Sequence, residues 1–200
     1  SISAGYQHSC GITSAGILKC WGLNAYGQLG DTTVVNKNIP TFVSGSITLV
    51  SSGYSHTCAI DTSSKLFCWG QNSSGQLGDG TTTERHLPTA IDSSENYVAV
   101  SAGKWFTCGL TSAGAVKCWG DNSSGQLGDG TITNHISPAV ITDSGTTYLK
   151  ISAGEKSVCG ITSSNDMKCW GDNLNSQLGT GDSISSKYPV TVSSGTFTSA

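Results

Sequence analysis

The sequence predicts an all-β fold in which one antiparallel unit is repeated four times. Two observations carry this prediction. A phrase of about fifty residues recurs along the chain, and short runs rich in Val, Ile, Thr and Tyr alternate with turn residues. Each copy reads Ser-x-Gly, a few variable residues, Cys, nine residues, Cys-Trp-Gly, then a turn and a proline. We expect one repeat array over residues 1–200, with repeats at approximately 1–46, 47–96, 97–147 and 148–200.

Composition narrows the classes of function. Charged residues make up 12% of the chain and the net charge is −3, which argues against a nucleic-acid groove, because such a groove needs clustered Lys and Arg. The single arginine, Arg85, leaves little capacity for bidentate phosphate recognition. No apolar run approaches the ~18 residues of a membrane span. The chain starts inside a repeat and without Met, so we expect a mature or excerpted segment.

The cysteines occur as four pairs of equal spacing. When Thr13 is placed opposite Ile17 across a short hairpin loop, Cys10 falls directly opposite Cys20, at a separation that a disulfide accepts. Evenly paired cysteines are typical of an oxidising compartment. Buried free thiols or a zinc site are the alternatives, although no zinc-type Cys-x2-Cys spacing occurs. The predicted disulfide partners are Cys10 and Cys20, Cys58 and Cys68, Cys108 and Cys118, and Cys159 and Cys169.

Strand alternation assigns two faces to each hairpin. The cysteine face carries apolar residues such as Ile12, whereas the tryptophan face carries a small residue such as Gly11, which leaves space for a neighbouring unit. The lysines on the tryptophan face are expected to reach solvent. A strand after each proline, such as 41–43, and another before each Ser-x-Gly, such as 47–50, complete four strands per repeat. This is the blade of a β-propeller.

The third copy, residues 101–131, shows the full pattern: Ala-Gly, then Thr-Cys, Lys-Cys-Trp-Gly and Gly-Gln-Leu-Gly-Asp-Gly-Thr. This pattern resembles the repeat of the regulator of chromosome condensation (RCC1) family, and the resemblance covers the whole chain. It implies a seven-bladed β-propeller, and the paired cysteines resemble the secreted or cell-surface branch. Four repeats imply part of a larger propeller or repeat array, and open end blades imply self-association.

Several motifs resemble ligand-binding or catalytic motifs, but each is interpreted here as structural. The Gly-Gln-Leu-Gly runs lack the lysine of a phosphate-binding loop and are interpreted as turns. The aspartates that follow them, Asp31, Asp79 and Asp129, are interpreted as turn caps, with calcium binding as the alternative. His8 and His56 occupy a slot that is Phe106 and Ser157 in the other copies. We therefore expect no catalytic residue, no cofactor and no enzyme activity.

The residues that differ between copies are the better functional candidates. Two variable residues follow each Ser-x-Gly, and in a propeller these turns gather on one rim. Tyr and Trp are frequent interface anchors, so a shared partner-binding surface is predicted, with ordinary exposed turn residues as the alternative. The candidates are Tyr6, Gln7, Tyr54, Ser55, Lys104, Trp105, Glu155 and Lys156. Two Asn-x-Ser triplets make Asn72 and Asn122 candidate glycosylation sites.

The function indicated is a non-enzymatic, extracellular or cell-surface scaffold. We expect disulfides to stabilise it, and we expect it to bind protein partners or further copies of itself. Its role would be structural or adhesive, and it could be glycosylated. The rival from another class is a guanine-nucleotide exchange factor, the activity associated with the founding family member. A secreted enzyme inhibitor of the same fold is a third hypothesis.

Overall fold

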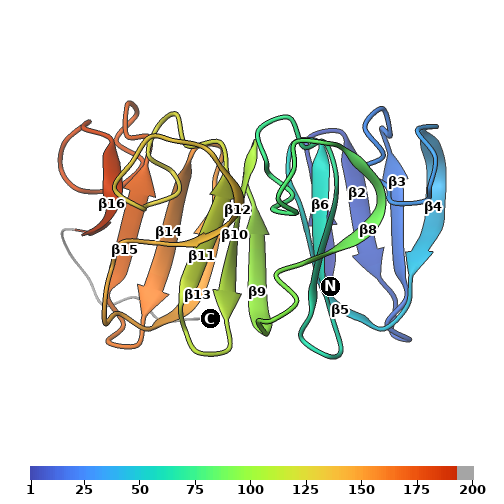
Figure 1. The fold of residues 1–200 in the computed structure, drawn as a ribbon, viewed down its shortest axis with the longest axis horizontal. Coiled ribbons are helices and arrows are strands. Elements are labelled where there is room, and N and C mark those ends of the chain that lie inside the picture. Colours follow the sequence, from blue (N-terminus) through green and yellow to red (C-terminus); the bar gives the residue numbers. More distant parts are fainter. Residues whose placement is uncertain (193–200) are drawn as a thin grey trace.

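The computed structural model describes residues 1–192, which form four antiparallel sheets of four strands each. Figure 1 shows these sheets, named blades 1 to 4, side by side in chain order. Blades 1 and 2 consist of β1 Ile2–Ala4, β2 His8–Ile12, β3 Leu18–Gly22, β4 Lys37–Ser44, β5 Ile47–Ser52, β6 His56–Asp61, β7 Leu66–Gly70 and β8 Arg85–Ile91. Blades 3 and 4 consist of β9 Tyr97–Ala102, β10 Phe106–Thr111, β11 Val116–Gly120, β12 His135–Val140, β13 Tyr148–Ala153, β14 Ser157–Thr162, β15 Met167–Gly171 and β16 Ser186–Thr191. The all-β prediction is confirmed, and residues 1–192 contain no helix that could cross a membrane.

The central hairpin of each blade has the predicted register. In blade 1, Cys10 pairs with Cys20 and the Thr13 N–H donates to the Ile17 carbonyl at 2.9 Å, closing the loop. The same pairing recurs in the other three blades. Each pair of cysteines is joined by a disulfide, with Cα atoms 4.1 Å apart, and no cysteine is left free.

This bonding pattern predicts the outcome of thiol labelling. We expect iodoacetamide in denaturant to add no mass to the unreduced protein, and to add eight labels after reduction, because all eight cysteines are bridged. Intact mass spectrometry measures both results, and the reduced sample serves as the control for reagent access. Eight labels without reduction would contradict the disulfide assignment.

The outer strand of each blade differs from the prediction. We expected it to follow the proline, but β4 begins at Lys37 and includes Pro40, and β8, β12 and β16 contain their prolines in the same way. The outer strand has a neighbour on one side only, so a missing N–H can be tolerated there. A register shift between Cys20 and Gly22 marks the irregularity beside Pro40.

Neighbouring blades pack the cysteine face of one against the tryptophan face of the next. Cys10 and Leu18 of blade 1 share a buried cluster with Ala59 and Trp69 of blade 2. Corresponding clusters join blade 2 to blade 3 and blade 3 to blade 4. In blade 2 the small residue Ala59 meets the cysteine face of blade 1, as predicted. In blades 3 and 4 the prediction is wrong, because Gly109 and Gly160 make room for Tyr97 and Tyr148 of their own blade.

Serine hydroxyls join the inner strands of neighbouring blades. The Ser3 hydroxyl accepts the Ser52 N–H at 2.9 Å, and Ser51 accepts the Ala102 N–H at 3.0 Å. Ser101 accepts the Ala153 N–H at 2.8 Å. The serine of the repeated Ser-x-Gly phrase thus holds consecutive inner strands together.

The turn after each tryptophan is organised around a buried asparagine. The Asn72 side-chain oxygen accepts the Leu77 N–H, while its amide nitrogen donates to Asp79 and to the carbonyls of Thr81 and Thr83. Both Asp79 oxygens accept hydrogen bonds from Asn, Thr or Arg donors. The turn-cap interpretation of the aspartates is confirmed.

Candidate interaction surface

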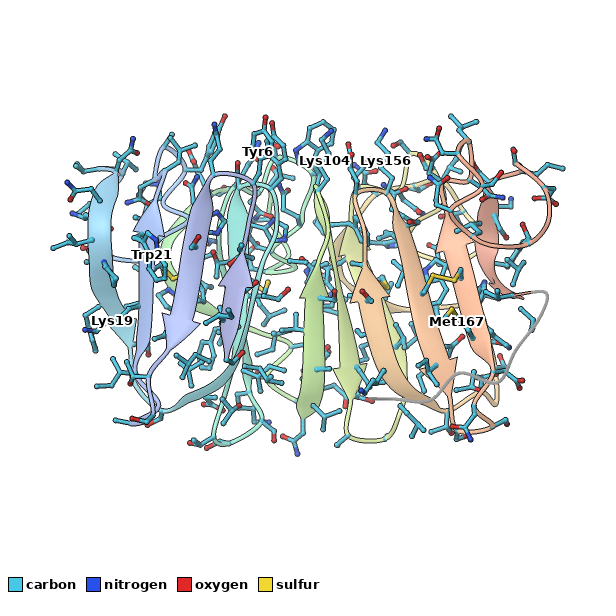
Figure 2. All side chains as sticks on the ribbon, turned by 180° about the vertical axis from the view of Figure 1, so that it is seen from behind. Tyr6, Lys19, Trp21, Lys104, Lys156 and Met167 are labelled. Carbon is cyan, nitrogen blue, oxygen red and sulfur yellow. A yellow bond between two sulfur atoms is a disulfide. The ribbon has the colours of Figure 1, made fainter. Side chains whose placement is uncertain are left out.

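The variable turns that follow the Ser-x-Gly triplets gather at one edge of the four blades. Each inner strand, β1, β5, β9 and β13, ends within such a triplet, and the chain turns there into the next strand. Figure 2 shows Tyr6, Lys104 and Lys156, which come from three different blades, along the same edge. Residues about fifty positions apart therefore become neighbours on this edge.

A row of aromatic rings crosses this edge. The rings of Tyr6 and Tyr54 are stacked, with centroids 4.1 Å apart and planes inclined by 12°. Trp105 meets Tyr54 edge-on, with a centroid distance of 6.3 Å and an angle of 66°. Tyr6 is 62% exposed, whereas Tyr54 and Trp105 are half-buried, so the row is most open to solvent at Tyr6.

An ion pair continues the row into blade 4. The Lys104 Nζ lies 2.5 Å from Glu155 Oε1, 4.8 Å from the Trp105 ring centroid and 5.6 Å from that of Tyr54. The hydrogen bond between Lys104 and Glu155 raises the pKa of the ammonium and lowers the pKa of the carboxyl. Both groups stay charged near neutral pH, within reach of a partner.

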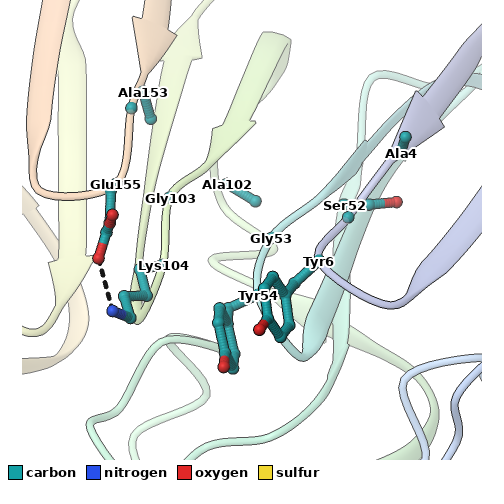
Figure 3. Close-up of a pocket in the computed structure, with 12 residues that line it drawn as sticks. Ala4, Tyr6, Ser52, Gly53, Tyr54, Ala102, Gly103, Lys104, Ala153 and Glu155 are labelled. Atoms are coloured by element: carbon teal, nitrogen blue, oxygen red, sulfur yellow. Dashed lines mark hydrogen bonds and ion pairs between the residues drawn. The ribbon is translucent and has the colours of Figure 1, made fainter.

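Beside this row lies an open hollow of about 500 Å³ (Figure 3). Its floor is made of small residues at the ends of the four inner strands: Ala4, Gly5, Ser52, Gly53, Ala102, Gly103, Ala153 and Gly154. Tyr6, Tyr54, Lys104 and Glu155 form its wall. We call the row of Tyr6, Tyr54, Trp105, Lys104 and Glu155, together with this floor, the rim surface.

The structure places the other candidate residues around or beneath the rim surface. Gln7, which follows Tyr6 in the chain, is exposed. Lys156 is half-buried at the same edge as Tyr6. Ser55 is only 4% exposed, so the expectation that it belongs to the partner-binding set is corrected. It occupies the same position in its repeat as Trp105, but its shorter side chain lies below the surface.

Two features of the rim surface cannot be recognised from the sequence of any one repeat. The small-residue floor is visible as the recurrent Ser-x-Gly phrase, but only the curvature of the four blades turns it into one hollow. Buried histidines lie directly below it, because a Cβ added to Gly5 or Gly53 would stand about 2.5 Å from a carbon of His8 or His56. In the sequence, the only sign of these buried histidines is a His two positions before a Cys, as at His8 and His56.

The glycosylation prediction is corrected by the fold. Asn72 and Asn122 are 1% and 0% exposed. The Asn122 amide nitrogen donates to the Asp129 carboxylate and to the carbonyls of Thr131 and Thr133, as Asn72 does in its own blade. A glycan would need that nitrogen and an open path to solvent, so both residues are structural and the folded chain leaves no room for a glycan on either.

Fold and surface together define a disulfide-bridged β-propeller array with an aromatic rim. The chain belongs to the regulator of chromosome condensation (RCC1) repeat family. One model of this repeat matches residues 16–60 and 63–110, and a second matches residues 1–28, 47–76, 97–126 and 149–177, so that all four blades are included.

Solved structures share the fold at low sequence identity. Human WBSCR16 is 22% identical with a TM-score of 0.86, and the match covers 97% of this chain and 52% of that one. Prp20p from Saccharomyces cerevisiae, whose structure was described with its binding to Gsp1p and histones, is 18% identical with a TM-score of 0.84, covering 97% and 50%. The ectodomain of the Arabidopsis thaliana receptor kinase ACR4 is 20% identical with a TM-score of 0.53, covering 96% and 52%. The chain thus spans about half the length of each of these proteins.

Proposed function

We propose that this chain is a non-enzymatic protein-interaction scaffold that works outside the cell and binds its partner through the rim surface. The observation that carries the proposal is the row of Tyr6, Tyr54 and Trp105 next to the Lys104–Glu155 pair. Tyrosine and tryptophan bury a large area on binding at a low cost in side-chain entropy, which makes them frequent anchors of protein interfaces.

The shape of the rim surface suits a protein partner. The hollow is open and its floor is built from small residues and backbone, so a loop or strand of a partner can approach closely. The ion pair at its edge offers one charge of each sign, which supports orientation of a polar partner. The stacked tyrosines hold each other in place before binding, so little order is lost on contact.

The disulfides support the extracellular setting. Four bridges in 200 residues are typical of proteins that mature in an oxidising compartment. The ectodomain of the Arabidopsis receptor kinase has the same fold outside a cell. The bridges also reinforce each blade separately, which suits a scaffold exposed to proteases and variable conditions.

The rim surface can be tested by comparing partner capture with two matched variants. We expect the double substitution Tyr54→Ala and Trp105→Ala to reduce capture of the native extracellular partner about 10- to 100-fold, because the two anchors together are expected to contribute about 1.4 to 2.8 kcal/mol of binding free energy. The control is Phe42→Ala with Tyr188→Ala, two exposed aromatic residues on the outer strands β4 and β16.

Quantitative mass spectrometry of the captured material, with circular dichroism to verify folding, measures the effect. Equal capture by the rim variant and the wild type would contradict the assignment of the surface. Accelerated nucleotide release from a small GTPase would instead favour exchange-factor activity, the rival function.

A further inference from the structure

A tyrosine, an aspartate and a lysine close the interface between blades 2 and 3. The ring of Tyr97, the first residue of β9, lies over Gly109, where an added Cβ would stand 2.5 Å from a ring carbon. Tyr97 and Trp119 belong to the same buried cluster. The Tyr97 hydroxyl donates to Asp92 Oδ2 at 2.9 Å, and Lys117 Nζ donates to the same oxygen at 2.8 Å.

The interface between blades 3 and 4 is closed in the same way. Tyr148 meets Trp170 edge-on, with ring centroids 6.2 Å apart. The Tyr148 hydroxyl donates to Asp143 Oδ2 at 2.5 Å, and Lys168 Nζ binds the Asp143 carboxylate at 2.9 Å. Because both lysines are held by carboxylates, the expectation that Lys117 and Lys168 simply extend to solvent is corrected.

The interface between blades 1 and 2 has none of these three side chains. Ile47 pairs with Asp61 as Tyr97 pairs with Thr111, so Ile47 stands at the position of the tyrosine. By the same comparison of registers, Phe67 stands at the position of the lysine. Only residues 45 and 46 connect β4 to β5, whereas residues 92–96 connect β8 to β9, and this shorter link contains no acid.

A partly enclosed cavity of about 320 Å³ lies at this interface. Its volume falls within the range of small-molecule binding sites, which are mostly apolar with a few polar groups. Three of the lining residues stand at the positions that tyrosine, lysine and tryptophan occupy in blades 3 and 4. The apolar lining consists of Leu18, Val43, Ile47, Phe67, Trp69 and Pro88.

Asp61 adds a carboxylate to the lining of this cavity. Its Oδ1 atom accepts the N–H groups of Ser63 and Lys65 at 2.8 Å each. Within residues 1–192 its Oδ2 atom accepts no hydrogen bond, and Asp61 forms no ion pair. The nearby Lys65 Nζ is engaged elsewhere, because it donates to the carbonyls of Ser93 and Glu95 at 3.0 Å.

Charge distinguishes this interface from the other two. There, each carboxylate is matched by the ammonium group of a lysine. Between blades 1 and 2 the carboxylate comes from Asp61, and the position of the lysine is taken by Phe67, whose ring face attracts a cation. A ligand that matches the cavity therefore carries a positive charge on an apolar body.

From this geometry we propose that the cavity between blades 1 and 2 binds an arylalkylamine, a small molecule whose aromatic ring carries an ammonium group on a short alkyl chain. The aromatic ring packs against Phe67, Trp69 and the aliphatic lining, and the ammonium donates to Asp61 Oδ2. Ile47 begins β5, whereas the rim surface includes Ser52 at the end of the same strand. The site is thus separate from the rim surface and does not depend on the function proposed for it.

Three probes with one aromatic ring and different charges test the proposal. At about pH 7 we expect 2-phenylethylamine to bind with a Kd on the order of 0.1–1 mM, which is ordinary for so small a ligand. The neutral 2-phenylethanol is expected to bind at least about 10-fold more weakly, and the anionic 3-phenylpropanoate not detectably, because Asp61 attracts the cation alone. Titration followed by nuclear magnetic resonance of the backbone amides measures each Kd and shows whether the shifts centre on Ile47, Asp61 and Phe67.

Two cavity variants separate the carboxylate from the apolar space. Asp61→Asn removes the charge but keeps a side-chain oxygen that can accept the two turn N–H groups, and it is expected to weaken amine binding about 10-fold. Ile47→Tyr combined with Ala59→Gly introduces the tyrosine and glycine that blades 3 and 4 contain. This pair is expected to fill the cavity and abolish detectable binding.

The matched control is Tyr54→Ala with Trp105→Ala on the rim surface, which is expected to keep the wild-type Kd for the amine. Thermal unfolding verifies that each variant is folded. The proposal would be overturned by the absence of shifts at about 10 mM amine, or by shifts confined to the rim surface. Equal binding of the amine and the alcohol, or undiminished binding in either folded cavity variant, would overturn it as well.

Discussion

Acidification from about pH 7 to about pH 4 is expected to destabilise the protein by several kcal/mol through two buried histidines. His8 Nε2 lies 2.8 Å from the Thr57 hydroxyl oxygen, and that hydroxyl donates its only proton to the Gln28 carbonyl at 2.8 Å. The threonine must therefore accept the Nε2 proton, which leaves His8 Nδ1 without a proton. This Nδ1 is buried and has no hydrogen-bond partner in the described structure.

His56 makes the same contacts at the interface between blades 2 and 3. Its Nε2 lies 2.9 Å from the Thr107 hydroxyl, which donates to the Gln76 carbonyl at 2.8 Å, and its Nδ1 is likewise unpartnered. Burial lowers the pKa of His8 to about 4, and burial followed by the charge of His8 lowers the pKa of His56 to about 3. Both values lie well below the ordinary 6.5.

The sign of the effect follows from these pKa values. Above about pH 6.5 the histidines are neutral in the folded and unfolded chain, so their contribution to stability is complete. As the pH falls from 6.5 toward 4 and then 3, the unfolded chain binds protons that the folded chain cannot, and stability is lost. Ordinary carboxyl groups titrate near pH 4, so the range between about pH 6.5 and 4.5 reports mainly on the histidines.

The interface between blades 3 and 4 shows which residues can replace the histidine and threonine. There Phe106 takes the place of the histidine and Val158 takes the place of the threonine, and both are buried. We expect His56→Phe with Thr107→Val to remove roughly half of the pH dependence between pH 6.5 and 4.5 in urea unfolding. His8→Phe with Thr57→Val should remove most of the remainder. Full pH dependence in the combined variant would contradict the assignment.

The substitution Trp119→Ala is expected to cost about 3–5 kcal/mol of unfolding free energy. Trp119 is 0% exposed and belongs to the cluster between blades 2 and 3, which includes Cys58, Leu77 and Tyr97. Its removal leaves a cavity at the centre of the array, where both neighbouring blades are held by their disulfides and relax little to fill it. Urea denaturation followed by far-ultraviolet circular dichroism measures the loss.

Trp21→Ala is the matched control for this loss. The residue holds the same position in blade 1, but it is half-buried and no blade of residues 1–192 covers it. We expect a cost of about 1 kcal/mol or less, because little buried area is lost. Equal costs at the two positions would show that the interface between blades contributes little, contrary to the packing described above.

Much of the blade could be predicted from residues close together in the chain. The loop between Thr13 and Ile17 determines the hairpin register, and the register places Cys10 opposite Cys20. The two faces followed from alternation alone. The position of the outer strand was predicted less well, because Pro40 suggests a strand boundary unless the one-sided neighbourhood of an edge strand is known.

The candidate site could be predicted only in part. Equal offsets after the Ser-x-Gly phrase identified Tyr6, Tyr54 and Trp105, and the structure brings them into one row. The same rule selected Ser55, which is buried, and a local triplet selected Asn72, which is engaged inside its turn. Local patterns do not report burial, so both errors have one cause.

By itself the sequence determined the repeat, the four-stranded blade, the hairpin register and the pairing of all eight cysteines. The register and the cysteine pairs depend on residues about ten positions apart, the two faces on the two-residue period of a strand, and the blade on a pattern that recurs about every fifty residues. Only the tertiary structure decided which faces meet and which turn residues form the rim surface. Those outcomes join residues about fifty positions apart, and they depend on how each blade is rotated against the next, which no local spacing encodes.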